Sequence, residues 1–230
     1  MKNGMLFLLL LLTATAFAQR TETRNVSGFT GIKVRSGIDL YLTQGNSEKI
    51  SLEIKGFDSD EVIVEVKNGV LELYIDKSNW GFSWGNNRYV KAYVTFKQLN
   101  KLIAGGGSDV YSQAKLNFNK LFLEVSGGSD TKLELDAQEL NVEASGGADA
   151  NLRGHVVKLN AVSSGGSDLK ATELRSEVCR VSASGGSDAY VSAEKEIAIV
   201  ASGGSDVYWS GNAKLIGKQS SGGSDIHRRN

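Results

Sequence analysis

The chain has 230 residues, of which 27 are Gly and none is Pro, although an average soluble chain holds about 7% Gly and 5% Pro. Its 26 basic and 26 acidic residues balance, which argues against a nucleic-acid partner and a polybasic membrane patch. Glycine without proline and without a three-residue period excludes collagen, while 40% hydrophobic residues suffice for a buried core.

Residues 1–18 predict a signal peptide. Lys2 precedes a short apolar run, and Ala16-x-Ala18 supplies the small residues that signal peptidase requires, so we expect cleavage before Gln19. The run is too short to span a bilayer, so no membrane span is expected. We expect an exported protein that lies in the periplasm, at the cell surface or outer membrane, or is secreted. Cys179 is the only cysteine, so no intramolecular disulfide forms in that compartment.

Residues 19–25 are expected to form an N-terminal tail, and residues 26–104 an irregular, strand-rich start of the fold. Ser36-Gly37-Ile38-Asp39 resembles a degenerate form of a corner motif found later in the chain. Alternating apolar residues predict strands over 50–54, 62–66, 71–75 and 90–96, and Asn68-Gly69 predicts a two-residue hairpin of the I′ kind. We expect this region to continue into the repeats that follow; the alternative is a separate second domain.

An aromatic segment interrupts these strands. We name as candidate ligand-binding residues Trp80, Phe82, Trp84, Arg88 and Tyr89. Exposed aromatic rings beside amide and guanidinium groups suit stacking on sugar rings or anchoring a protein partner. The alternative is a hydrophobic plug over the first rung.

Residues 105–230 are a repeat that predicts a β-solenoid. Gly-Gly-Ser-Asp or a close variant occurs seven times, 18 to 21 residues apart, ending at Asp109, Asp130, Asp149, Asp168, Asp188, Asp206 and Asp225. Apolar residues alternate before each corner, as in Leu121-x-Leu123-x-Val125. This period predicts an all-β fold: a right-handed, single-stranded parallel β-helix with rungs of about 19 residues. Lys218, Ser220 and Arg228 take the inward places of the last unit, which predicts a polar C-terminal cap.

The corner Asp residues form a ladder of like charges that needs compensation. Carboxylates about 5 Å apart repel by roughly 1 kcal/mol in water and more in a drier setting. We expect a structural ladder, in which each Asp accepts hydrogen bonds from its own corner and the Ser hydroxyls link the rungs. The alternative is calcium bound between successive corners. Near the corners lie Tyr111, Tyr190, Tyr208 and Trp209, which are expected to pack on the flat faces; the alternative is a binding stripe.

No catalytic or metal-binding residues are predicted. His155 and His227 are the only histidines, and they stand in a turn and in the terminal cap, without a Cys partner. The Asp ladder repeats along the whole solenoid, whereas an active site needs particular residues at one place. We therefore expect a protein that is not an enzyme and has no cofactor.

Five features of the sequence form a combined pattern: Gly28-Phe29, the strand from Asp39 to Gly45, the Asn68-Gly69-Val70-Leu71 hairpin, Val94-Thr95-Phe96 with Leu99 and Leu102, and the chain of Gly-Ser-Asp corners. This pattern resembles the head GIN domain family, which is often labelled as auto-transporter adhesins and is common in Bacteroidetes. The resemblance covers roughly residues 26–225 and implies a single-stranded right-handed β-helix in an exported protein.

The expected function is adhesion or ligand binding at the bacterial envelope, through a surface that the solenoid presents. The partner would be a glycan or a surface protein. The alternatives are a protein that binds or cleaves polysaccharides, and a structural envelope protein that associates with itself as a homo-oligomer.

Overall fold

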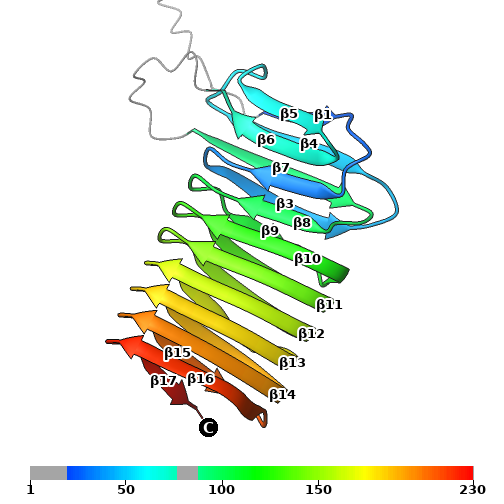
Figure 1. Cartoon of the computed structure of the whole chain (residues 1–230). Coiled ribbons are helices and arrows are strands. Elements are labelled where there is room, and N and C mark those ends of the chain that lie inside the picture. Colours follow the sequence, from blue (N-terminus) through cyan, green and yellow to red (C-terminus); the bar gives the residue numbers. More distant parts are fainter. Residues whose placement is uncertain (1–19, 77–87, 230) are drawn as a thin grey trace, which may run out of the picture.

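The computed structural model describes residues 20–76 and 88–229, and over these ranges the secondary structure is entirely β. No helix suited to crossing a membrane occurs in this part of the chain. The strands form one 17-stranded sheet that coils into a β-solenoid of about seven turns, with rungs about 19 residues apart. Figure 1 shows the rungs stacked in a single column from the N-terminal strands to the C-terminus. The predicted fold class is confirmed.

The regular part of the column contains long, bent strands that pair in parallel with the next rung. Its strands are β10 (Leu116–Ser126), β11 (Asp130–Ser145), β12 (Asp149–Gly165), β13 (Asp168–Gly185), β14 (Asp188–Gly203), β15 (Asp206–Ser210), β16 (Lys214–Gly222) and β17 (Asp225–Arg228). Each rung runs along one face, turns at its Gly-Gly corner and returns along a second face. The register brings each corner Asp opposite the next, as in Asp149 with Asp168.

The N-terminal strands join the same sheet, but not in chain order. They are β1 (Arg20–Arg24), β2 (Gly31–Val34), β3 (Ile38–Gln44), β4 (Lys49–Lys55), β5 (Val62–Lys67), β6 (Val70–Ile75), β7 (Tyr89–Phe96), β8 (Lys101–Ala104) and β9 (Val110–Ser112). Strand β2 lies between β6 and β8, and β3 lies between β7 and β9. The rung made by β2 and β3 therefore lies between β6–β7 and β8–β9, although β2 and β3 precede all four of those strands in the chain.

Two predictions for this region have different outcomes. Asn68 and Gly69 have φ values of 52° and 74° and close the β5–β6 hairpin, as the I′ turn requires. The tail expected over residues 19–25 is wrong, because residues 20–24 form β1, which pairs antiparallel with β4. No side chain of β1 is apolar, so the strand is held by backbone pairing. Its sequence therefore has no hydrophobic alternation from which the strand could be predicted.

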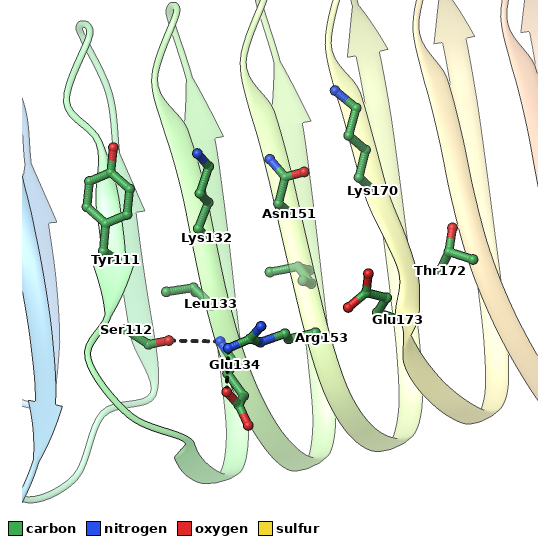
Figure 2. Close-up of a pocket in the computed structure, with 11 residues that line it drawn as sticks. Tyr111, Ser112, Lys132, Leu133, Glu134, Asn151, Arg153, Lys170, Thr172 and Glu173 are labelled. Carbon is green, nitrogen blue, oxygen red and sulfur yellow. Dashed lines mark hydrogen bonds and ion pairs between the residues drawn. The ribbon is translucent and has the colours of Figure 1, made fainter.

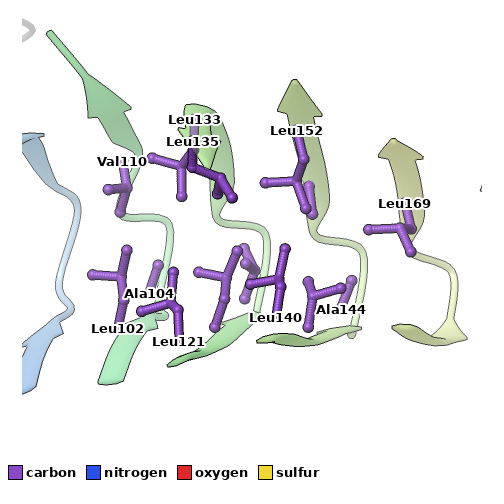
Figure 3. Close-up of a cluster of buried hydrophobic side chains, with 14 of the residues drawn as sticks. Leu102, Ala104, Val110, Leu121, Leu133, Leu135, Leu140, Ala144, Leu152 and Leu169 are labelled. Carbon is purple, nitrogen blue, oxygen red and sulfur yellow. The ribbon is translucent and has the colours of Figure 1, made fainter. Parts of the chain in front are cut away.

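The core is a column of inward side chains between the two faces (Figure 3). Five of the seven places that lie three residues after a corner Asp are buried, and they hold Leu133, Leu152, Ala171, Val191 and Trp209. Leu121, Leu123 and Val125 are fully buried on the other face. Cys179 belongs to the same column, and its burial raises the pKa of its thiol to about 12. Burial disfavours the thiolate, so this cysteine is a packing residue.

The corners need glycine because the chain turns there in a left-handed conformation. The first glycine of each later corner has a positive φ, for example 76° at Gly203, where an added Cβ would lie 3.0 Å from the carbonyl oxygen of Gly185. Side chains rarely adopt this conformation, and the rung spacing leaves no room for one. Corner Ser residues are buried and link the rungs: Ser187 Oγ donates to the carbonyl oxygen of Ser163 at 2.9 Å.

The column ends on exposed, charged side chains. Lys218 lies opposite Ile199 and Arg228 opposite Trp209, so both occupy inward places that have no further rung beyond them in the described chain. Every residue of β16 is exposed, and the Arg228 guanidinium lies 4.8 Å from the centre of the Trp209 ring. These are the features expected of a polar cap.

Candidate functional site

The corner Asp residues lie in register along one edge of the solenoid, and their hydrogen bonds run between rungs. The Oδ1 atoms of Asp109 and Asp206 accept from the backbone N–H groups of Asp130 and Asp225, each at 3.0 Å. Asp188 Oδ1 accepts from the Asp206 N–H at 3.3 Å. The prediction that each Asp caps its own corner is therefore wrong for these residues, because the acceptor faces the N–H of the following rung.

Other side chains offset the charge of the ladder. Lys170 Nζ lies 2.9 Å from Asp149 Oδ2 and 3.2 Å from Asp168 Oδ2, so one cation bridges two rungs. The hydrogen bond to Asp149 is the main cause of a raised pKa for Lys170. At the other end, burial is the first cause and Asp109 the second cause of a raised pKa for Asp39, while Lys91 lowers it. Repulsion between neighbouring carboxylates is thus partly compensated by cations.

We expect removal of calcium to leave the melting temperature unchanged. Three corner carboxylates already accept backbone N–H groups and two more contact Lys170, so most of the ladder has a partner that offsets its repulsion without an ion. The measurement is thermal unfolding with EDTA, then with calcium restored. The first place to look for a bound ion is the group formed by Asp206, Asp225 and His227. In the described chain, one ligand atom of each of these residues lies within 4.8 Å of the others. A fall in Tm that calcium reverses would support the calcium alternative.

A row of outward side chains, which we call the outer row, occupies the places two residues after each corner Asp and the places in register with them on the N-terminal strands β3 and β7. In spatial order it consists of Tyr93, Tyr41, Tyr111, Lys132, Asn151, Lys170, Tyr190, Tyr208 and His227. Because the strands are in register, adjacent rings stack. Their centroids are 5.0 Å apart for Tyr41–Tyr93, 5.2 Å for Tyr41–Tyr111 and 4.9 Å for Tyr190–Tyr208.

The tyrosines that were expected to pack on the flat faces lie there, on the outside of the solenoid. The hydroxyl of each donates a hydrogen bond to the Asp of its own corner. The hydroxyls of Tyr111 and Tyr208 donate to Asp109 at 3.2 Å and to Asp206 at 3.3 Å. Burial is the first cause, and Asp109 the second, of a Tyr111 pKa raised to about 12, so this phenol stays protonated. Trp209 differs because it is buried in the core.

Between its two aromatic stacks the outer row carries polar side chains, and here the surface is hollowed. The groove has a volume of about 480 Å³ and is lined by Tyr111, Ser112, Lys132, Leu133, Glu134, Asn151, Leu152, Arg153, Lys170, Thr172 and Glu173. In Figure 2 Tyr111 stands at one side, with Lys132, Asn151 and Lys170 on the successive rungs. At the far side β13 departs from the register of its neighbours near Thr172, so the strand bulges beside the groove.

The predicted aromatic segment is only partly described. Trp80, Phe82 and Trp84 lie outside the described residues, so their role stays a prediction. The Arg88 guanidinium lies 4.0 Å from the centre of the Phe57 ring, and the Tyr89 hydroxyl donates to Glu53 Oε1 at 2.8 Å. These two side chains are therefore engaged in contacts within the N-terminal strands.

Sequence reasoning missed the groove because each of its side chains resembles an ordinary surface residue. The available signal was the change from Tyr to Lys, Asn and Lys at one repeat position, followed by a return to Tyr. That interruption becomes visible only when the outer row is compared between rungs.

Comparisons with known proteins agree on the fold. A family model described as "Putative auto-transporter adhesin, head GIN domain" matches residues 28–213. A solved "putative adhesin" from Bacteroides fragilis NCTC 9343 is similar, with 24% identity, a TM-score of 0.81 and coverage of 92% of this chain and 97% of that chain. None of the curated proteins matches this chain.

Two further solved structures are similar at lower identity. A "putative lipid binding protein" from Parabacteroides distasonis ATCC 8503 has 18% identity and a TM-score of 0.68, covering 92% of this chain and 97% of its own. A "putative adhesin" from Parabacteroides merdae ATCC 43184 has 14% identity and a TM-score of 0.69, covering 92% and 96%. At these identities the likeness shows the fold alone.

Proposed function

Since this chain belongs to the head GIN domain family, we propose that it is an exported adhesin that works by presenting the outer row to a partner at the cell envelope. Membership confirms the resemblance inferred from the Gly-Ser-Asp corners and the Asn68-Gly69 hairpin. The observation that carries the proposal is the outer row itself. A rigid solenoid holds its rings and cations at fixed spacing, so a partner would bind without ordering the surface first.

Several features support a binding role without catalysis. The corner carboxylates repeat along the column, and those of Asp109, Asp188 and Asp206 accept backbone N–H groups of the following rung, which is a structural use of these groups. The tyrosines of the outer row are half-buried, as expected for rings that stack on each other and still present an edge to solvent. Residues 1–18 support export, as the sequence predicts.

The test is accessibility on intact cells. We expect an externally added protease to remove the protein from whole cells, and cells lacking it to attach less well to wells coated with a panel of polysaccharides and matrix proteins. Complementation with the full chain should restore attachment. Full protection from the protease, with attachment unchanged by deletion, would overturn the adhesin proposal. A cytoplasmic protein followed in the same samples controls for lysis.

A further inference from the structure

The groove between the aromatic stacks contains polar groups that the protein does not use itself. Lys132, Asn151 and Glu173 line it, and in the described part of the chain their side chains take part in no hydrogen bond or ion pair. Together they offer an ammonium donor, an amide that both donates and accepts, and a carboxylate acceptor. Such a set leaves hydrogen-bonding capacity for a bound polar molecule.

The neighbouring charged side chains are already engaged in ion pairs, and they stand on paired strands that hold the walls of the groove in place. Arg153 Nη2 lies 2.8 Å from Glu134 Oε2, and the backbone N–H of Glu134 donates to Ser112 Oγ at 2.8 Å. Lys170 is held by the two corner carboxylates already described. The unpaired side chains therefore stand between preorganised neighbours.

Tyr111 supplies an aromatic surface at one side of the groove. Tyr41 stacks against one side of this ring, and the next residue of the outer row on the other side is Lys132. Its hydroxyl is bonded to Asp109, so the ring has a fixed orientation. A rigid ring with one side against the groove suits contact with an apolar face of a ligand.

The charges of the groove nearly cancel. Three cations, Lys132, Arg153 and Lys170, stand against the carboxylates of Glu134 and Glu173, and the corner carboxylates at Lys170 add further negative charge. These carboxylates would repel a strongly anionic polymer, and the lysines would repel a cationic one. The balance favours a ligand without net charge that has many hydrogen-bonding groups.

We propose that this groove binds an uncharged glycan, with one sugar ring against Tyr111 and its hydroxyls bonded to Lys132, Asn151 and Glu173. The inference rests on the proposed function, because it names the ligand of the same outer row. The groove volume of about 480 Å³ lies within the range of small-molecule sites, roughly 300–1,000 Å³. It is large enough for a few sugar units of a longer chain.

The experiment measures binding of the purified mature chain to immobilised mannan, β-glucan and galactan, with heparin and polygalacturonate as anionic probes. We expect at least one uncharged polysaccharide to bind. Tyr111→Ala should weaken that binding by up to about ten-fold, since a ring contact is worth up to about 1.5 kcal/mol and each 1.4 kcal/mol is a factor of ten. Asn151→Ala should weaken it about three-fold or more through a lost hydrogen bond.

Tyr208→Ala is the matched control, because it removes a stacked ring of the outer row away from the groove. Its affinity should stay within about two-fold of the wild type. Absence of binding to all uncharged probes, binding to the anionic probes alone, or equal losses for Tyr111→Ala and Tyr208→Ala would each overturn the proposal. Asn151→Ala keeps the test valid if Tyr111→Ala fails to fold.

Attachment of whole cells separates this proposal from the broader one. If cells with Tyr111→Ala and Asn151→Ala attach as well as the wild type while deletion abolishes attachment, the groove proposal fails and the adhesin proposal stands. If deletion has no effect but the purified chain binds an uncharged glycan, the adhesin proposal fails and the groove proposal stands.

Discussion

Gly154→Ala is expected to lower the free energy of unfolding by at least about 3 kcal/mol, or about 6–12 °C in Tm for a chain of this size. Gly154 has a φ of 120°, and a Cβ built on it would lie 2.0 Å from the carbonyl oxygen of Leu135. That oxygen belongs to the backbone of the preceding rung, so no side-chain rotation removes the overlap. The measurement is thermal or denaturant unfolding of the purified chain.

Gly166→Ala is the control for this prediction. Gly166 is the second glycine of a corner, has no positive φ, and an added Cβ there meets no atom within 4 Å. Its Tm should change by no more than the equivalent of about 0.5 kcal/mol. Similar losses for both variants would contradict the backbone overlap as the cause.

The contrast between these glycines shows what the repeat could predict. The period and the alternation placed the inward residues correctly, because each rung buries the same positions against the next. The Gly-Gly motif does not show which of its two glycines needs a positive φ, because that need follows from the geometry of the turn and not from the residue type. In the corner at Gly165 and Gly166 only the first has it.

The spatial order of the N-terminal strands was not predictable from the sequence. Strands β2, β6 and β8 have the same apolar alternation, so any of them fits beside any other. Which one lies in the middle is decided by the β5–β6 hairpin, which returns the chain to the outside of β2. The local sequence pattern therefore predicts each strand, but it does not predict which strands pair, because pairing joins residues that are far apart in the chain.

The candidate site was predicted in its parts but not in its arrangement. The sequence placed tyrosines near the corners and aspartates at them, and both were assigned to packing and structure. Stacking at about 5 Å follows once the register is known, as for Tyr208 on His227 at 5.0 Å. The groove depends on the side chains of Lys132 and Asn151, which are narrower than the rings of the two stacks. It also depends on a bulge in β13, which no sequence motif predicts.

Replacing Lys218 and Arg228 together by Val is expected to convert the C-terminal end of the solenoid into a self-associating surface. Both residues occupy inward places on the last rung, above Ile199 and Trp209. Valine there would extend the apolar column to the end of the chain, beside Leu215 and Ile216, which are already 39% and 48% exposed. An apolar face with unpaired strand edges pairs readily with another chain. Size-exclusion chromatography with light scattering should detect dimers or larger species at concentrations where the wild type shows fewer.

The cap prediction depends on position, so its control removes the same charges elsewhere. Lys158 and Arg175 are exposed side chains of β12 and β13, and their double replacement by Val adds equal apolar bulk to the middle rungs. That variant should keep the oligomeric state of the wild type, because both edges of these strands are already paired. If both double variants associate equally, general loss of charge is the cause. If only the cap variant associates, Lys218 and Arg228 protect the open end, which weighs against the self-associating envelope protein as this chain's role.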